Sequence, residues 1–72
     1  GVQKDAEKAF ACYEKAARMG NVVAGYNVAV CYENGNGVRR DLGMARQWYE
    51  WSSKQGDAPS LEALRRLDRT RR

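Results

Sequence analysis

The side chains that most often carry out acid–base and nucleophilic chemistry are scarce in this sequence. It contains no histidine, the commonest general base at neutral pH and a frequent metal ligand. Its two cysteines, Cys12 and Cys31, stand nineteen positions apart, which matches neither a zinc motif nor a disulfide framework. Two interpretations stay open: either both are small buried apolar residues, which we favour, or they form a disulfide bond.

The remaining candidates for catalysis are carboxylates, tyrosines and a glycine-rich stretch. Glu14 and Glu50 recur at the same spacing as Tyr13 and Tyr49, so we interpret all four as features of a repeat. The stretch NGNG at residues 34–37 lacks the Lys-Ser/Thr pair of a phosphate-binding loop. The sequence therefore predicts no catalytic residue, no cofactor site and no metal site, and a protein that is not an enzyme.

Basic side chains gather at the C-terminal end of the chain. The formal net charge is +4, and residues 61–72 contain five arginines against two acidic residues. Such an end can attract nucleic acid or acidic lipid, although the macrodipole also favours cations at any helix C-terminus. The candidate anion-binding residues are Arg65, Arg66, Arg69, Arg71 and Arg72. No aromatic residues alternate with them, which argues against a nucleic-acid site based on stacking.

These residues belong to an internal repeat with a period of 36 residues. The identical pairs are Gly1/Gly37, Val2/Val38, Asp5/Asp41, Ala9/Ala45, Tyr13/Tyr49, Glu14/Glu50 and Gly20/Gly56. Many of them are separated by four or seven residues within a unit, which is the spacing of one helix face. A fixed period of roughly 20–50 residues is typical of helical arrays whose units stack to form a shared core. The pattern predicts an all-α superhelix, a solenoid of about four antiparallel helices.

The helix boundaries follow from capping residues and glycines. Asp and Asn side chains can accept hydrogen bonds from first-turn amides, and glycine can adopt the left-handed conformation that ends a helix. Proline in a first turn does no harm, since its missing amide is not needed there. The expected helices run from Asp5 to about Met19, from Asn21 to about Asn34, from Asp41 to Gln55, and from Asp57 to a frayed C-terminal end.

Small residues are expected where these helices approach closely. On the first helix they are Ala9, Ala16 and Ala17, and on the third they are Ala45, Ser52 and Ser53. Larger side chains should fill the space that remains: Tyr13, Val28, Cys31, Tyr32, Trp48, Tyr49, Leu64 and Leu67. Val2 and Val38 precede the expected caps and should pack back onto their helices.

The middle of the chain resembles a Sel-1-like repeat, a type of tetratricopeptide-like helical repeat. The resemblance is carried by Ala24, Tyr26-Asn27-Val28-Ala29, Tyr32-Glu33-Asn34-Gly35, Gly37-Val38, Asp41, Ala45, Trp48-Tyr49-Glu50 and Gly56. It implies a full repeat at residues 21–56, preceded at 1–20 by the second half of another. Residues 57–72 would form a C-terminal capping helix, because Asp68 stands where Tyr32 would recur. The chain is therefore expected to be a C-terminal fragment of a longer array.

The resemblance implies a non-catalytic scaffold or adaptor that binds another protein or peptide on a superhelical surface. Such proteins are frequent in bacteria, so a bacterial source is expected, and no run of apolar residues suggests a transmembrane segment. The compartment is not specified by the sequence. The candidate protein-binding residues are Val23, Tyr26, Val30 and Glu33 on the second helix, Glu62 and Arg66 beside Pro59 and Arg69 on the last, and Trp51 on the third.

Several alternatives stay open for this surface. The row at Val23, Tyr26 and Val30 is either a binding face or a face covered by a preceding half-repeat. Trp51 is either an exposed contact residue or packed under the C-terminal helix, which we favour. The alternative function is binding of nucleic acid or an anionic surface through the arginines. Self-association through the open N-terminal repeat face is a further partner hypothesis.

Overall fold

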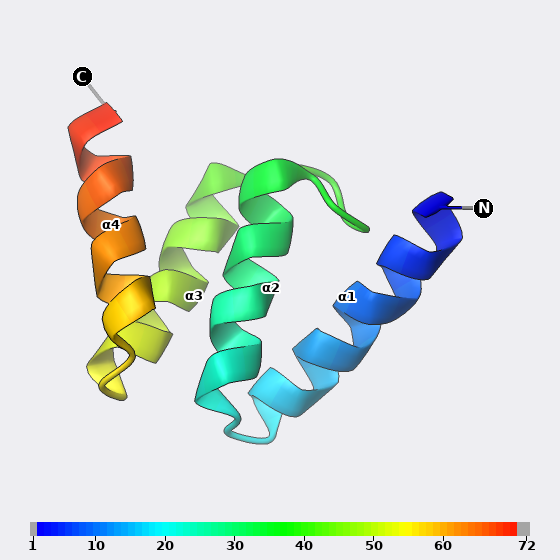
Figure 1. The fold of residues 1–72 in the computed structure, drawn as a ribbon, viewed down its shortest axis with the longest axis horizontal. Coiled ribbons are helices and arrows are strands. Elements are labelled where there is room, and N and C mark those ends of the chain that lie inside the picture. The colour runs from blue at the N-terminus through cyan, green and yellow to red at the C-terminus, as the bar shows by residue number, and fades with distance from the viewer. Residues whose placement is uncertain (1, 71–72) are drawn as a thin grey trace.

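The computed structural model is a layer of helices that run alternately up and down (Figure 1). It describes the backbone of residues 2–70 and the side chains of residues 4–69. The helices are α1 (Val2–Arg18), α2 (Val22–Asn34), α3 (Leu42–Lys54) and α4 (Ala58–Thr70). Each packs against its neighbours in the chain, α2 against α1 and α3, and α4 against α3. This architecture confirms the all-α repeat fold predicted from the sequence.

Three of the four predicted N-terminal caps are present. Asn21 and Asp41 each accept a hydrogen bond from the backbone N–H three residues further on, at 2.9 and 3.1 Å. Asp57 accepts one from the backbone N–H of Ser60 at 3.1 Å and another from its hydroxyl at 2.6 Å. Because each cap satisfies an amide that has no partner within the helix, the starts of α2, α3 and α4 are fixed locally.

The two repeat units end their second helices in the same way. Gly20 and Gly56 both have φ of +99°, a left-handed conformation that favours glycine. The backbone N–H of the residue after Gly20 donates to the Ala16 carbonyl at 3.0 Å, and the one after Gly56 donates to the Ser52 carbonyl at 3.1 Å. This is the hydrogen-bond pattern of a Schellman motif, so α1 and α3 turn into the following helix with the same local geometry.

The predicted cap at Asp5 is wrong. Helix α1 begins at Val2, which places Asp5 inside its first turn. At the equivalent Asp41, the backbone N–H donates to the Tyr32 carbonyl at 2.9 Å, and the chain is extended before α3 begins. No helix among residues 2–70 offers Asp5 a corresponding carbonyl, so residues 2–4 continue the helix. The predicted packing of the Val2 side chain lies outside the described side chains.

Two clusters of buried side chains form the core. The first joins α1 to α2 and contains Phe10, Ala17, Ala24, Val28 and Cys31. The second joins α2, α3 and α4 and contains Ala29, Ala45, Tyr49, Ala63 and Leu67. Phe10, which the sequence did not single out, meets the Tyr32 ring edge to face at a centroid distance of 5.3 Å. Tyr32 and Trp48 pack against both clusters and make the core continuous.

Two residues predicted to pack on α1 are exposed instead. Ala9 is exposed and Tyr13 is 37% exposed, whereas the equivalent Ala45 and Tyr49 are 0% and 1% exposed. The physical reason is the neighbouring helix. α2 lies along this face of α3, and no described helix occupies the corresponding place before α1.

Neither interpretation of the cysteine pair is fully correct. Both thiols are free, so the disulfide bond left open as an alternative is absent. Cys31 is buried in the first cluster, as expected for a small apolar residue, and burial raises the pKa of its thiol. Cys12 is exposed, because it lies on a part of α1 that α2 does not cover.

Candidate protein-binding site

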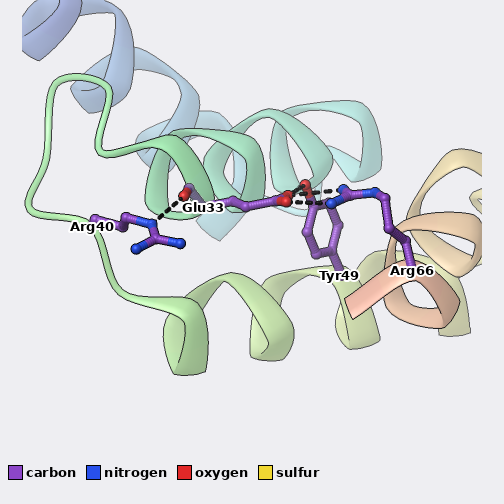
Figure 2. A network of polar contacts seen from close by, with 4 residues as sticks. All are labelled: Glu33, Arg40, Tyr49 and Arg66. Atoms are coloured by element: carbon purple, nitrogen blue, oxygen red, sulfur yellow. Dashed lines mark hydrogen bonds and ion pairs between the residues drawn. The ribbon is translucent and has the colours of Figure 1, made fainter. Parts of the chain in front are cut away.

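The last turn of α2 carries a polar network centred on Glu33 (Figure 2). The Tyr49 hydroxyl from α3 donates to Glu33 Oε1 at 2.7 Å. Arg66 from α4 donates through both terminal nitrogens, at 2.5 Å to Oε2 and 3.0 Å to Oε1. Arg40 donates from Nε to the backbone carbonyl of Glu33 at 3.0 Å. One residue at the end of α2 therefore joins α3, α4 and the α2–α3 loop.

The contacts of this network favour the ionised carboxylate of Glu33. The hydrogen bond from Arg66 is the main reason that the pKa of Glu33 lies below its ordinary value, against the opposing effect of burial. Burial first, and the hydrogen bond to Glu33 second, raise the pKa of the Tyr49 hydroxyl. The Glu33 side chain is 16% exposed and that of Arg66 is 51% exposed, so solvent screens the ion pair on one side. At neutral pH the network holds the negative charge of Glu33 and the positive charges of Arg66 and Arg40.

A hollow of about 560 Å³ opens between α2 and α4. Its lining residues are Tyr26 from α2 and Pro59, Glu62, Ala63, Arg65, Arg66 and Arg69 from α4. Tyr26 packs against the second cluster, with its ring centroid 5.8 Å from that of Tyr49. The volume lies within the roughly 300–1,000 Å³ of ordinary ligand pockets. The hollow thus combines one aromatic wall with a cationic wall.

Five residues that the sequence placed on two separate helices line this single hollow. They are Tyr26, Pro59, Glu62, Arg66 and Arg69. They come together because α2 and α4 both pack against α3. Their role in binding a protein stays a prediction. Arg65 and Ala63 also line the hollow, and the sequence signal for them was the same helical spacing on α4.

The other residues of the row on α2 do not form a continuous open face. Val30 is half-buried against the second cluster, and the Glu33 carboxylate is occupied by Tyr49 and Arg66. Val23 is 63% exposed near the start of α2. The expected apolar row is therefore interrupted, because α2 turns Tyr26 and Val30 toward α3 and α4.

A second hollow, of about 450 Å³, lies between α1 and α3 and contains Trp51. The Trp51 and Trp48 rings meet at 84° with centroids 5.8 Å apart. Trp51 also covers Gly25 of α2, where an added Cβ would come within 2.6 Å of its ring. Packing under α4 was therefore the wrong prediction, since Trp51 packs on α2. The signal missed in the sequence was Gly25 itself, a glycine inside a helix, which usually has a packing reason.

The arginines proposed for anion binding differ in their contacts. Arg66 is bonded to Glu33, while Arg65 and Arg69 are exposed and form no ion pair with another described residue. Arg46 and Asp68 form an ion pair that joins α3 to α4. Arg71 and Arg72 lie outside the described residues. Two arginines with no ion-pair partner among the described residues are thus present at the hollow, and the alternative set of five stays untested at Arg71 and Arg72.

Two other kinds of feature are absent from the described part of the chain. Residues 2–70 hold no group of three or more cysteine or acidic side chains placed to bind a metal ion. In the same range, no helix has both the length and the apolar character needed to cross a membrane. The hollow between α2 and α4 stays the candidate site.

Stacked helix pairs with recurring glycine stops and a continuous core define a helical repeat protein. The model of the Sel1 repeat matches residues 1–21 and 22–57. The chain belongs to the Sel1 repeat family, as its resemblance to Sel-1-like repeats predicted. The two matched segments meet at the turn after α1, where Asn21 caps the next helix.

Three curated relatives are similar to this chain. It is 38% identical over 63 residues to DAP3-binding cell death enhancer 1 of Rattus norvegicus. The aligned segment covers 88% of this chain and 12% of that protein. It is 37% identical over 68 residues to chitin synthase regulatory factor 3 of Schizosaccharomyces pombe. That aligned segment covers 93% of this chain and 7% of the relative. The mouse (Mus musculus) counterpart of the rat protein is 42% identical over 52 residues, covering 72% and 10%.

The short length of these matches and their source organisms limit which properties of the relatives can be inferred for this chain. The chain spans about a tenth of the length of the curated relatives it matches, at 12%, 7% and 10%. All three come from eukaryotes, so the expected bacterial source gains no support. No significantly similar solved structure was found.

Proposed function

We propose that this chain is a non-catalytic protein-interaction module that binds a protein or peptide segment in the hollow between α2 and α4. The observation that carries the proposal is the hollow itself, an open site of about 560 Å³ between helices that share the Glu33 network. Helices held in place before binding lose less entropy when a partner docks. The family supports the proposal, as do relatives whose names describe binding to DAP3 and regulation of chitin synthase.

The candidate residues take different roles in this proposal. Tyr26 is the proposed aromatic anchor, since aromatic residues are enriched among the strongest contacts of interfaces. Glu62 and Arg66 provide polar contacts at the wall of the hollow, and Val23 extends the apolar surface at the start of α2. Glu33 and Val30 support the site from within. Trp51 belongs to the α1–α3 hollow and is proposed as a packing residue.

The arginine-based alternative makes a different prediction. Binding to nucleic acid or an anionic surface would weaken steeply with added salt, because each phosphate contact releases counterions. The bond between Arg66 and Glu33 favours the protein-binding proposal, since it removes one arginine from the basic set. A self-associating chain is a further proposal, supported by the exposed Ala9 and Tyr13 on α1. Sedimentation over a range of concentrations measures it directly.

Affinity capture from a nuclease-treated lysate tests the proposed function. We expect a protein retained by the wild-type chain to be lost with Tyr26→Ala and kept with Gln47→Ala, a matched change in the α1–α3 hollow. Circular dichroism checks that both variants keep their helices. Retention by Tyr26→Ala would remove the α2–α4 hollow as the docking site. Loss with Gln47→Ala alone would place docking between α1 and α3.

A further inference from the structure

We propose that the α2–α4 hollow selects an acidic peptide segment, in which carboxylates flank one apolar side chain. The carboxylates would bind Arg65 and Arg69, and the apolar side chain would pack on Tyr26. This inference rests on the proposed function and adds the chemistry of the partner.

Charge at the hollow carries the first step. Its lining contains three arginines and one acidic residue, Glu62. Arg66 is already neutralised by Glu33, whereas Arg65 and Arg69 have no ion-pair partner among the described residues. Residues four apart are neighbours on a helix surface, so the two free guanidinium groups lie on the same face of α4. The three arginines, taken with Glu62 and the Glu33 carboxylate, leave one net positive charge at the hollow, which favours an acidic partner.

The chain itself contains an example of the recognition that is proposed. On the same helix, Arg66 binds the Glu33 carboxylate with both terminal nitrogens, at 2.5 and 3.0 Å (Figure 2). The planar guanidinium fork matches the two oxygens of a carboxylate, and such paired bonds add geometric specificity. Arg65 and Arg69 flank Arg66 and line the same hollow, so they present this chemistry to a carboxylate from outside.

The apolar part of the hollow explains why a single acidic group is not enough. Tyr26, Pro59 and Ala63 contribute an aromatic ring, a rigid pyrrolidine and a methyl group to the lining. A partner side chain packed there would cover apolar surface that α2 and α4 leave open. A segment with an aliphatic residue between two glutamates can contact both the apolar wall and the arginines. A free carboxylate can contact the arginines alone.

The same residues argue against nucleic acid and lipid as the occupant. A phosphate backbone needs a continuous basic track, but the hollow has only two arginines without an ion-pair partner among the described residues, and Glu62 lines it one turn before them. Base stacking needs open aromatic faces, and Tyr26 is the one aromatic side chain of the lining, half-buried against the Tyr49 ring. A peptide can instead place its charges and its apolar group at separate points.

Fluorescence anisotropy with a defined peptide tests the inference. The probe is a labelled glutamate–leucine–glutamate segment in a glycine–serine background, beside a peptide with glutamines in place of both glutamates. We expect the glutamate peptide to bind, the glutamine peptide to fail, and Arg65→Gln/Arg69→Gln to weaken binding about tenfold. The control Lys8→Gln/Arg39→Gln removes the same charge from exposed residues outside the hollow and should leave binding unchanged.

Several outcomes would overturn the inference. Equal binding by Arg65→Gln/Arg69→Gln, equal binding of the two peptides, or no peptide binding at all would each do so. A thymidine oligonucleotide or a phosphatidylserine vesicle that binds through these arginines, while the peptide fails, would assign the hollow to phosphate. If capture of a partner is lost with Tyr26→Ala but kept with Arg65→Gln/Arg69→Gln, the proposed function stands and the acidic-peptide inference is wrong.

Discussion

Tyr13 and Tyr49 occupy the same position in consecutive repeat units, yet their side chains differ in how far they are buried. Tyr49 is 1% exposed and donates its hydroxyl to Glu33, whereas Tyr13 is 37% exposed. The helices that carry them are also unequally covered. α3 packs against α2 and α4, while α1 packs against α2. A repeat sequence thus specifies which face of a helix can be buried, and the neighbouring helix decides whether it is.

The alanines at the next equivalent position show the same contrast. Ala45 lies in the second core cluster with no exposed surface, and Ala9 is exposed on α1. Because the two residues are identical and occupy equivalent positions, the difference in their exposure depends on the neighbouring helix alone. Substitutions made in pairs can therefore measure how much each covering helix contributes.

The largest expected effect comes from truncating the two tyrosines. Tyr49→Ala removes a buried ring, its contact with Tyr26 and its hydrogen bond to Glu33, and should lower the free energy of unfolding by about 3–5 kcal/mol. Tyr13→Ala removes a partly exposed ring and should cost about 1 kcal/mol or less. Urea unfolding measured by circular dichroism compares them. Equal losses would show that α1 is covered in solution.

An intermediate effect is expected from enlarging the two alanines. Ala45→Leu forces extra methyl groups into a packed site and should destabilise the chain by about 1–3 kcal/mol. Ala9→Leu adds them to an exposed helix face, where leucine is a good helix former, and should change stability by less than about 0.5 kcal/mol. Thermal unfolding of both variants measures the difference. A clear loss with Ala9→Leu would contradict an open α1 face.

The smallest effect concerns the carboxylate that Tyr49 contacts. Because the pKa of Glu33 is lowered in the folded chain, its stabilising effect is present above the ordinary glutamate pKa of about 4.3. It is lost as the pH falls through the lower folded value. Given the half-exposed Arg66, we expect about 1 kcal/mol at neutral pH.

A pair of glutamine variants isolates this effect from the other acidic groups. Glu33→Gln should lower the unfolding temperature at pH 7 and match the wild type near pH 3. Glu7→Gln, at an exposed residue with no ion pair to another described residue, should follow the wild-type profile throughout. A Glu33→Gln profile parallel to the wild type at every pH would show that the network adds no stability.

Local features of the fold were predictable from the sequence because they need few partners. The caps at Asn21, Asp41 and Asp57 and the glycine stops each depend on hydrogen bonds spanning a few residues. The repeat register also placed Tyr26 and the α4 row on equivalent helices. That register accounts for the residues that meet at the α2–α4 hollow.

Features that depend on distant contacts were not predictable in the same way. Glu33 reaches Tyr49 and Arg66 across 16 and 33 positions, and no local pattern indicates that pairing. The exposure of Tyr13 depends on what lies beside α1, and the site of Trp51 on the space above Gly25. In each case the residue type was informative, but the neighbour was set by the packing of whole helices.

The network at Glu33 has a consequence for how related sequences can diverge. One carboxylate serves donors from α3 and α4, so replacing Arg66 alone leaves a mostly buried charge without its counterion. Positions 33, 49 and 66 should therefore be substituted together during evolution, although they lie on three different helices. Recombination that exchanges one unit for another would separate a glutamate from its arginine, which favours the inheritance of adjacent units as a matched pair.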